Sequence, residues 1–303
     1  MKPKMLLIGG FPWSATSPLV YTLQRYTKYA HFGYTKQFKY LITTGRSASS
    51  RNIFDIYDHV RNGTWENYMS DEPGTHRMNL TVDLEPLRDF PVTHFTQLMT
   101  GDHTISKYMD FYHALYDHVI TKGYKSVGDC YIGYKTSRDD LREFYDTLRS
   151  EFDVKVLAIA RDPVRRAFSE YLYRKLKTPQ HLQVIDYMGA INRFQSLFDD
   201  VHVTVMEELW EGDAKRELSE FLNTNVTDLW KNLYSPDKGH LVEYDKDVPC
   251  QAFGQELEEL TIDTYNSLKN KHQGVYDSWR DYYGSLPMQW GQPLDYKFDY
   301  WHI

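Results

Sequence analysis

The sequence predicts an α/β protein in which helices cover both faces of a parallel β-sheet. Three observations lead to this fold class. Short apolar runs without polar alternation, such as residues 154–160, are typical of strands that are buried on both faces. Amphipathic segments with a helical period separate these runs. The alternation of strand and helix along the chain implies crossover connections, which join parallel strands.

Each predicted element has its own local signal. Strands are expected at the apolar runs 5–8, 154–160 and 203–206, and at the weaker segments 29–34 and 125–128. Helices are expected at the amphipathic segments 18–29, 139–152, 163–176, 215–222 and 255–271. Two of these helices also carry start signals. Ser137 with Asp140 forms a capping box, and Asp162 followed by Pro163 marks a helix N-terminus.

The whole chain, residues 1–303, is predicted to form a single domain. Residues 48–105 have the weakest pattern, so we expect an insertion there that serves as an acceptor-binding lobe. The aromatic tail after Tyr282 is expected to pack back onto the body. Aromatic residues make up 16% of the chain, which suits either a well-filled core or a cleft for a sugar or aromatic acceptor.

Charge and composition limit the classes of function. The net charge of −7 argues against a nucleic-acid partner. No apolar run reaches the length of a membrane span, and the first strand follows Met1 too closely for a signal peptide. We therefore expect a cytoplasmic protein without a membrane partner, and the composition leaves its oligomeric state open. Cys130 and Cys250 make no disulfide framework, so we expect two reduced thiols, with a single bridge between them as the alternative.

The first motif is LLIGGFPWSATSPLVYTLQ, residues 6–24, which has the pattern of a buried strand, a loop and a helix start. Gly9 and Gly10 are expected to let the backbone turn sharply after the strand. Hydroxyl groups follow at Ser14, Thr16 and Ser17. The last of these is predicted to cap the helix, whose first N–H groups would bind an anion. The same residues also suit an ordinary strand–turn–helix connection, so this motif leaves both interpretations open.

The second motif is VLAIARDPVRRAFSEYLY, which places Arg161 at the end of a buried strand and Ser169 eight residues later on the next helix. A guanidinium and a hydroxyl in this arrangement can hold one phosphate from two sides. The alternative is that Arg161 pairs with Asp162 or Glu170 at an exposed helix start.

Together these motifs resemble the sulfotransferase family, whose members use 3′-phosphoadenosine-5′-phosphosulfate (PAPS). GFPWSATSPL, residues 10–19, is similar to the family's loop G-x-P-[KR]-S-G-T-[ST]-x-L for the 5′-phosphosulfate. RDPVRRAFSEY, residues 161–171, is similar to R-[DN]-P-x-x-R-x-x-S-x-Y, which binds the 3′-phosphate. VGDCYIGY and VHVTVMEELWEGDAKRELSEFLN resemble further parts of the family pattern in the same order. The resemblance implies a three-layer sandwich with a central parallel sheet, the P-loop-NTPase-like sulfotransferase fold.

The resemblance also implies an activity. The sulfuryl group of PAPS would move to a hydroxyl or amine of a saccharide-like or small-molecule acceptor, with adenosine 3′,5′-bisphosphate leaving and no metal taking part. The residues that it assigns to the co-substrate are Gly10, Phe11, Pro12, Trp13, Ser14, Ala15, Thr16, Ser17, Arg161 and Ser169. The alternatives are a catalytically lapsed nucleotide-binding protein and a P-loop kinase variant, although the missing Gly-Lys-[Ser/Thr] argues against a kinase.

The chain departs from the family pattern at residues that matter for catalysis. Trp13 stands where the family loop has Lys or Arg, and Ala15 stands where it has Gly. Lys36 and Lys39 in GYTKQFKYL are therefore the candidate cations that would stabilise the leaving group. This segment resembles a K-E-x-H stretch in which the Glu is the general base. Gln37 stands at that position and cannot accept a proton.

Other residues are then candidates for the general base. They are Asp129, His94 and His31, and each of them also suits a purely structural role. His113 and His118 do not have the i, i+4 spacing of a zinc-binding helix, so no metal site is predicted.

Overall fold

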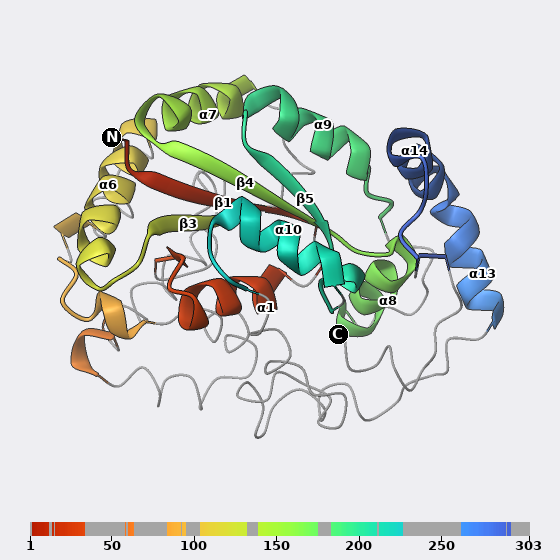
Figure 1. The fold of residues 1–303 in the computed structure, drawn as a ribbon, viewed down its shortest axis with the longest axis horizontal. Coiled ribbons are helices and arrows are strands. Elements are labelled where there is room, and N and C mark those ends of the chain that lie inside the picture. Colours follow the sequence, from red (N-terminus) through yellow and green to blue (C-terminus); the bar gives the residue numbers. More distant parts are fainter. Residues whose placement is uncertain are drawn as a thin grey trace.

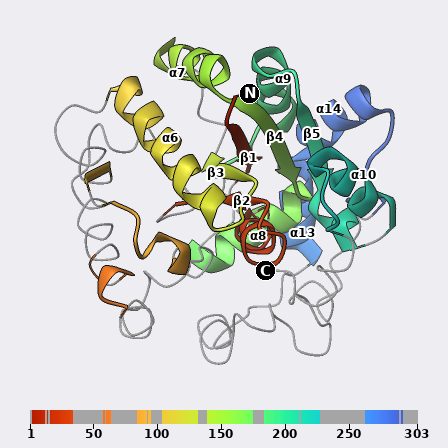
Figure 2. The same cartoon turned by 60° about the vertical axis from the view of Figure 1, so that its left-hand side comes forward.

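The computed structural model describes residues 2–11, 14, 16–33, 58, 60–63, 84–91, 93–94, 104–131, 139–174, 183–210, 212–226, 262–288 and 290–291. Within these residues, five strands form one sheet in the order β2-β3-β1-β4-β5, and every pairing is parallel. The strands are β1 (Lys4–Gly10), β2 (Ala30–His31), β3 (Ser126–Tyr131), β4 (Asp153–Ala160) and β5 (Val201–Val205). Three of them lie at the predicted apolar runs and two, β2 and β3, at the weaker segments. The predicted α/β fold class is confirmed (Figures 1 and 2).

Helices cover both faces of the sheet, as the sequence predicted (Figures 1 and 2). One face is covered by α6 (Ile105–Thr121), α7 (Asp139–Glu151) and α9 (Tyr187–Leu197). The other is covered by α1 (Thr16–Tyr21), the π-helical turn η1 (Thr22–Tyr26) and α10 (Gly212–Leu222). Alternate residues of β1 serve the two faces, since Met5 and Leu7 join the first core and Leu6 and Ile8 join the second.

The order of the strands creates a point where the connections diverge. From β1 the chain passes through α1 to β2, on one side of β1 in the sheet. From β4 it passes through α8 (Pro163–Arg174) and α9 to β5, on the other side. Ligands of open α/β sheets bind at such a switch point, next to the carboxyl ends of the two strands. The topology therefore predicts a ligand site at the residues that follow β1 and β4.

Among the helices whose bounds the described residues give, three are absent from the sequence prediction. They are α6, α9 and α14 (Gln273–Tyr283), the last of which follows α13 (Ile262–Lys271). Much of the buried face of α6 is aromatic, with Tyr108, Phe111 and Tyr112 each nearly inaccessible to solvent. Aromatic residues form helices less readily than Ala or Leu, so the residue types of this segment did not indicate a helix. None of the described helices is long and apolar enough to cross a membrane.

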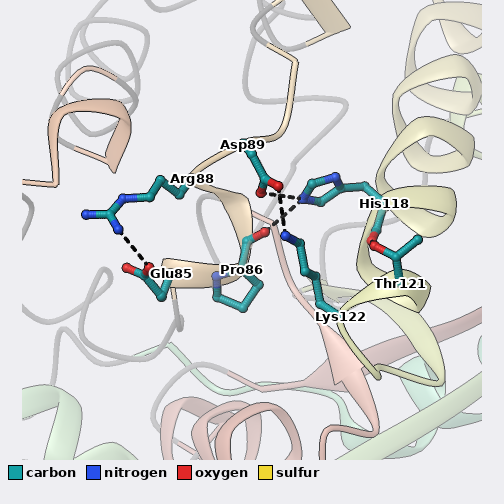
Figure 3. Close-up of polar contacts among 7 residues, drawn as sticks. All are labelled: Glu85, Pro86, Arg88, Asp89, His118, Thr121 and Lys122. Atoms are coloured by element: carbon teal, nitrogen blue, oxygen red, sulfur yellow. Dashed lines mark hydrogen bonds and ion pairs between the residues drawn. The ribbon is translucent and has the colours of Figure 1, made fainter.

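The predicted lobe at 48–105 lies mostly outside the described residues, but its segment 84–91 packs against α6. This segment contains a short 3₁₀ helix, η2 (Glu85–Leu87). His118 Nε2 donates to Pro86 O at 2.8 Å, and Lys122 Nζ donates to Asp89 Oδ2 at 2.8 Å (Figure 3). One contact to the backbone and one between two side chains thus hold this segment along α6.

The described part of the C-terminal tail packs onto the body, as predicted. Trp290 is only 3% exposed and belongs to the core that α9, α13 and α14 share. Cys130 is buried as a thiol in β3, whereas Cys250 lies outside the described residues.

The glycines at the end of β1 provide room and do not form the turn that the sequence suggested. Both lie within the strand, and neither is among the glycines with a left-handed φ. A Cβ at Gly10 would lie 2.1 Å from Thr16 Cγ2, and a Cβ at Gly9 would lie 2.7 Å from Phe194 Cε2. Helix α1 begins at Thr16, so the prediction that Ser17 caps it is wrong.

We expect Gly10→Ala to lower the free energy of unfolding by about 1–3 kcal/mol, the usual cost of overpacking. Replacing Thr16 by Ser removes the methyl group that the new Cβ would meet, so the double variant Gly10→Ala/Thr16→Ser should recover part of the loss. Urea unfolding of the parent, both single variants and the double variant measures the coupling. Purely additive losses would contradict this explanation of the glycine.

Candidate functional site

The pairing of β1 with β4 brings the two sequence motifs to one edge of the sheet. Gly10 is aligned with Ile159, so β1 ends one residue before the end of β4. Phe11 follows the first strand, and Arg161 follows the second. Segments that are separated by about half of the chain therefore begin their loops side by side (Figure 1).

A tyrosine of α9 contacts both loops. The ring of Phe11 stacks on the ring of Tyr187, with centroids 4.1 Å apart and planes inclined by 19°. The Tyr187 hydroxyl donates to Arg161 O at 2.9 Å. On the Phe11 side the backbone closes a tight turn, because Ser14 N donates to Phe11 O at 3.1 Å. The convergence that the sequence predicted is thus held together by side-chain contacts.

The described residues of the first loop are all buried or partly buried. Ser14 is inaccessible to solvent, and its hydroxyl has no partner of standard hydrogen-bond geometry among the described residues. The nearby Tyr187 hydroxyl still interacts with it, since burial raises the pKa of Tyr187 and the interaction with Ser14 lowers it in part. The methyl group of Thr16 lies against Gly10 at the start of α1. Pro12, Trp13 and Ala15, together with the side chains of Ser17 and Ser169, lie outside the described residues.

The second loop begins a helix with the predicted cap. Asp162 Oδ1 accepts from Val164 N at 2.8 Å and from Arg165 N at 3.0 Å. Pro163 occupies the first position of α8, where a missing N–H group costs nothing. This cap orients the chain directly after Arg161.

Behind Arg161, Asp162 and a glutamate that follows β5 accept hydrogen bonds from several segments. Asp162 N donates to Glu207 Oε1 at 3.0 Å, and Trp290 Nε1 donates to Glu207 Oε2 at 3.1 Å. Gly291 N donates to Asp162 Oδ2 at 2.7 Å, and the Tyr276 hydroxyl lies 3.0 Å from the same oxygen. The C-terminal tail and α14 therefore close the inner side of the site. We call Asp162 and Glu207 with these donors the carboxylate hub.

The charges of the hub act on one another because they are shielded from water. Burial raises the pKa of Glu207, and the neighbouring Asp162 carboxylate raises it further. The Arg161 guanidinium opposes both effects and lowers the pKa of Glu207. Arg161 itself is 4% exposed, so its charge is buried next to these carboxylates.

Arg166, which stands at the second arginine of the family pattern, has a structural role. Arg166 is fully buried, and its Nη1 pairs with Glu170 Oε2 at 3.0 Å. Its Nη2 donates to Gln183 O at 2.9 Å. Glu170, which the sequence offered as a partner for Arg161, thus pairs with Arg166.

The candidate bases that the structure describes each have a local partner. Asp129 is buried in β3 and accepts from the Tyr112 hydroxyl at 2.7 Å, on the α6 side of the sheet. His31 Nδ1 accepts from Gly33 N at 3.0 Å. His94 lies beside the Phe90 ring, with centroids 5.8 Å apart. These partners, Tyr112, Gly33 and Phe90, lie outside the two motif loops.

The remaining catalytic candidates, Lys36, Gln37 and Lys39, lie outside the described residues. Sequence reasoning missed Tyr187, Tyr276 and Trp290, which hold the site from α9, α14 and the tail. Only Glu207 had a sequence signal, since it lies in the MEEL segment that resembled the family pattern. In the described part of the chain, no three His, Cys, Asp or Glu side chains are grouped so that they could hold a metal ion.

Comparisons with known proteins give structural likeness only. No family model matches the chain, and no curated protein is significantly similar to it. A sulfotransferase from Alicyclobacillus acidocaldarius is 17% identical over 96% of this chain and all of that one, with a TM-score of 0.49. The sulfotransferase domain of the Synechococcus PCC 7002 olefin synthase is 12% identical over 90% of this chain and 95% of that one, with a TM-score of 0.41. At such low similarity, the function has to be argued from the site.

The raised pKa of Glu207 predicts how stability depends on pH. In the unfolded chain Glu207 releases its proton at the ordinary pKa of 4.5. In the folded protein it keeps this proton to a higher pH. Glu207 therefore contributes most to the free energy of unfolding below pH 4.5, and its contribution declines as the pH rises through the folded-state pKa. Glu207→Gln cannot titrate, so the free energy of unfolding of the parent minus that of the variant should fall with rising pH.

Urea unfolding of both proteins between about pH 4 and pH 8 measures this difference. The matched control is Glu220→Gln, which changes an exposed glutamate of α10. A difference that stays constant over this range would show that Glu207 does not titrate as its burial requires.

Proposed function

We propose that this protein is a PAPS-dependent sulfotransferase, which moves a sulfuryl group to a hydroxyl or amine of a saccharide-like or small-molecule acceptor. The observation that carries the proposal is the convergence of the two motifs at the switch point of the sheet, joined through Tyr187. The resemblance of both motifs to the sulfotransferase pattern supplies the identity of the ligand.

The groups at this edge suit a ligand with two separated phosphate-type ends. The first loop offers hydroxyl groups and backbone N–H groups before α1, and the second offers the Arg161 guanidinium. All of these are donors, which is the chemistry that an anion requires. The nearby carboxylates of Asp162 and Glu207 accept bonds from protein donors, and Arg161 lies beside them as a compensating cation. In the proposal the loop holds the 5′-phosphosulfate, and Arg161 with Ser169 holds the 3′-phosphate.

When bound, PAPS would supply the activated sulfuryl group. Donors of the loop would stabilise the negative charge that develops on the departing 5′-phosphate. Because Trp13 carries no charge, Lys36 or Lys39 takes the role of the cation in this proposal. Asp129 and His94 remain the proposed bases. Asp129 already accepts the Tyr112 hydroxyl bond, so it would serve only if the acceptor reached that buried position.

A catalytically lapsed nucleotide-binding protein is the second candidate. Trp13 and Gln37 favour it, since each replaces a group that the family uses in catalysis. Both candidates predict binding of adenosine 3′,5′-bisphosphate, and they differ in turnover. A kinase variant would require ATP and magnesium, for which the loop lacks the Gly-Lys-[Ser/Thr] element.

Two measurements separate these functions. Isothermal titration calorimetry without magnesium should show binding of adenosine 3′,5′-bisphosphate and none of ATP. Transfer of labelled sulfate from PAPS to a panel of sugars and phenols then identifies an active enzyme. Binding without transfer would support the lapsed protein, and binding of ATP alone would refute both.

We expect Arg161→Ala to weaken binding of adenosine 3′,5′-bisphosphate by about 2–3 kcal/mol, because a charged hydrogen-bond donor to the 3′-phosphate is lost. Arg161→Lys keeps the charge but loses the forked donor geometry, so its affinity should fall between those of the parent and the alanine variant. Arg149→Ala, at an arginine of α7 that is 41% exposed, is the matched control. Parent-like affinity in a folded Arg161→Ala protein would remove this residue from the site.

A further inference from the structure

We propose that Tyr187 is a positioning residue that sets the separation of the two phosphate-binding loops, so that the site recognises both ends of one nucleotide together. This inference rests on the proposed function and assigns to α9 a role that neither motif contains. Tyr187 would not touch the reacting atoms. It would act through Phe11 on one side and through the backbone of Arg161 on the other.

The contacts of Tyr187 are divided between the two loops. Its ring lies nearly parallel to that of Phe11, which fixes the first residue of the turn at 11–14. Its hydroxyl donates to the main-chain oxygen of Arg161, which fixes the chain from which the guanidinium extends. One side chain thus contacts both loops. Because an aromatic side chain has few rotatable bonds, these two contacts keep the loops at a fixed separation.

The rest of the structure holds Tyr187 in place. The residue is 1% exposed and lies on α9, whose N-cap Asp186 accepts from Gly189 N at 2.8 Å. The ring of Trp290 meets the ring of Tyr187 edge to face, with centroids 6.1 Å apart. Because Trp290 also donates to Glu207, the position of Tyr187 depends on the same tail that closes the carboxylate hub.

The hydroxyl of Tyr187 remains a donor at every working pH. Burial raises the pKa of Tyr187 well above its ordinary value of 10.0, and the charges of Asp162 and Glu207 raise it further against the opposing charge of Arg166. A phenol that stays protonated can always donate to Arg161 O. The Tyr187 hydroxyl is therefore available as the donor in this contact at neutral pH.

A role in positioning makes a different prediction from a role in stability alone. A ligand with one phosphate needs only one loop, whereas a ligand with two phosphates needs both loops at a fixed separation. Loosening the link should therefore penalise adenosine 3′,5′-bisphosphate more than adenosine 5′-phosphate. A residue that only stabilises the fold would lower the melting temperature without changing the ratio of the two affinities.

The test compares two buried tyrosines by calorimetry with both nucleotides. Tyr187→Phe keeps the ring and removes the hydroxyl. Tyr112→Phe is the matched control, because it removes a buried hydroxyl that donates to Asp129 at 2.7 Å on the α6 side of the sheet. For Tyr187→Phe we expect the Kd of the bisphosphate to rise roughly five- to tenfold and that of the monophosphate to rise less than about twofold. For Tyr112→Phe both changes should stay below about twofold.

Amide hydrogen exchange provides a measurement without any ligand. The amide of Ser14 donates to Phe11 O within the first loop, and the amide of Asp162 in the second loop donates to Glu207 Oε1 after β5. In Tyr187→Phe both amides should exchange roughly fivefold faster than in the parent, and in Tyr112→Phe neither should change. If the phenylalanine variant does not fold, Phe11→Leu removes the ring stack from the other side and should give the same pattern.

The outcomes separate this inference from the proposed function. An unchanged ratio of affinities in Tyr187→Phe overturns the positioning role, even if the protein binds the bisphosphate tightly. If the parent binds neither nucleotide, the proposed function fails and the exchange rates decide about Tyr187. Unchanged exchange at Ser14 and Asp162 would then overturn the link between the loops as well.

Discussion

The parallel pairing of β1 with β4 is the constraint on which the rest of the structure depends. Because parallel strands end at the same edge, this pairing alone places the loop after Gly10 beside the loop after Ala160. Its register is fixed by burial on both faces. Slipping by one residue would turn Leu6 and Ile8 toward the opposite core and would move Gly9 from under Phe194. The site is therefore a consequence of how the sheet packs.

The carboxylate hub shows why the C-terminal tail belongs to the site. Asp162 and Glu207 would be costly to bury without donors, and the tail supplies the indole of Trp290 and the amide of Gly291. Arg161 lies against these acidic groups, so its charge is partly compensated. Both carboxylates accept hydrogen bonds from other parts of the protein, so Arg161 is not their only compensating partner.

The sequence was most informative where a residue's role depends on its near neighbours. Continuous apolar runs marked the strands, because burial on both faces removes polar residues from them. Asp162 before Pro163 marked a helix start, since a cap acts within three residues. Tyr187 had no such signal, because its two contacts are distant in the sequence and meet only in the folded chain. The sequence likewise did not show that position 10 has no space for a side chain, since this depends on where the methyl group of Thr16 lies in the fold.

A crystal structure of the protein with adenosine 3′,5′-bisphosphate tests the central claim most directly. The account predicts one nucleotide at the carboxyl edge of β1 and β4, with its 3′-phosphate on the Arg161 guanidinium and its 5′-phosphate over the loop that precedes α1. A nucleotide bound elsewhere, or bound without contact between its 3′-phosphate and the Arg161 guanidinium, would contradict the account.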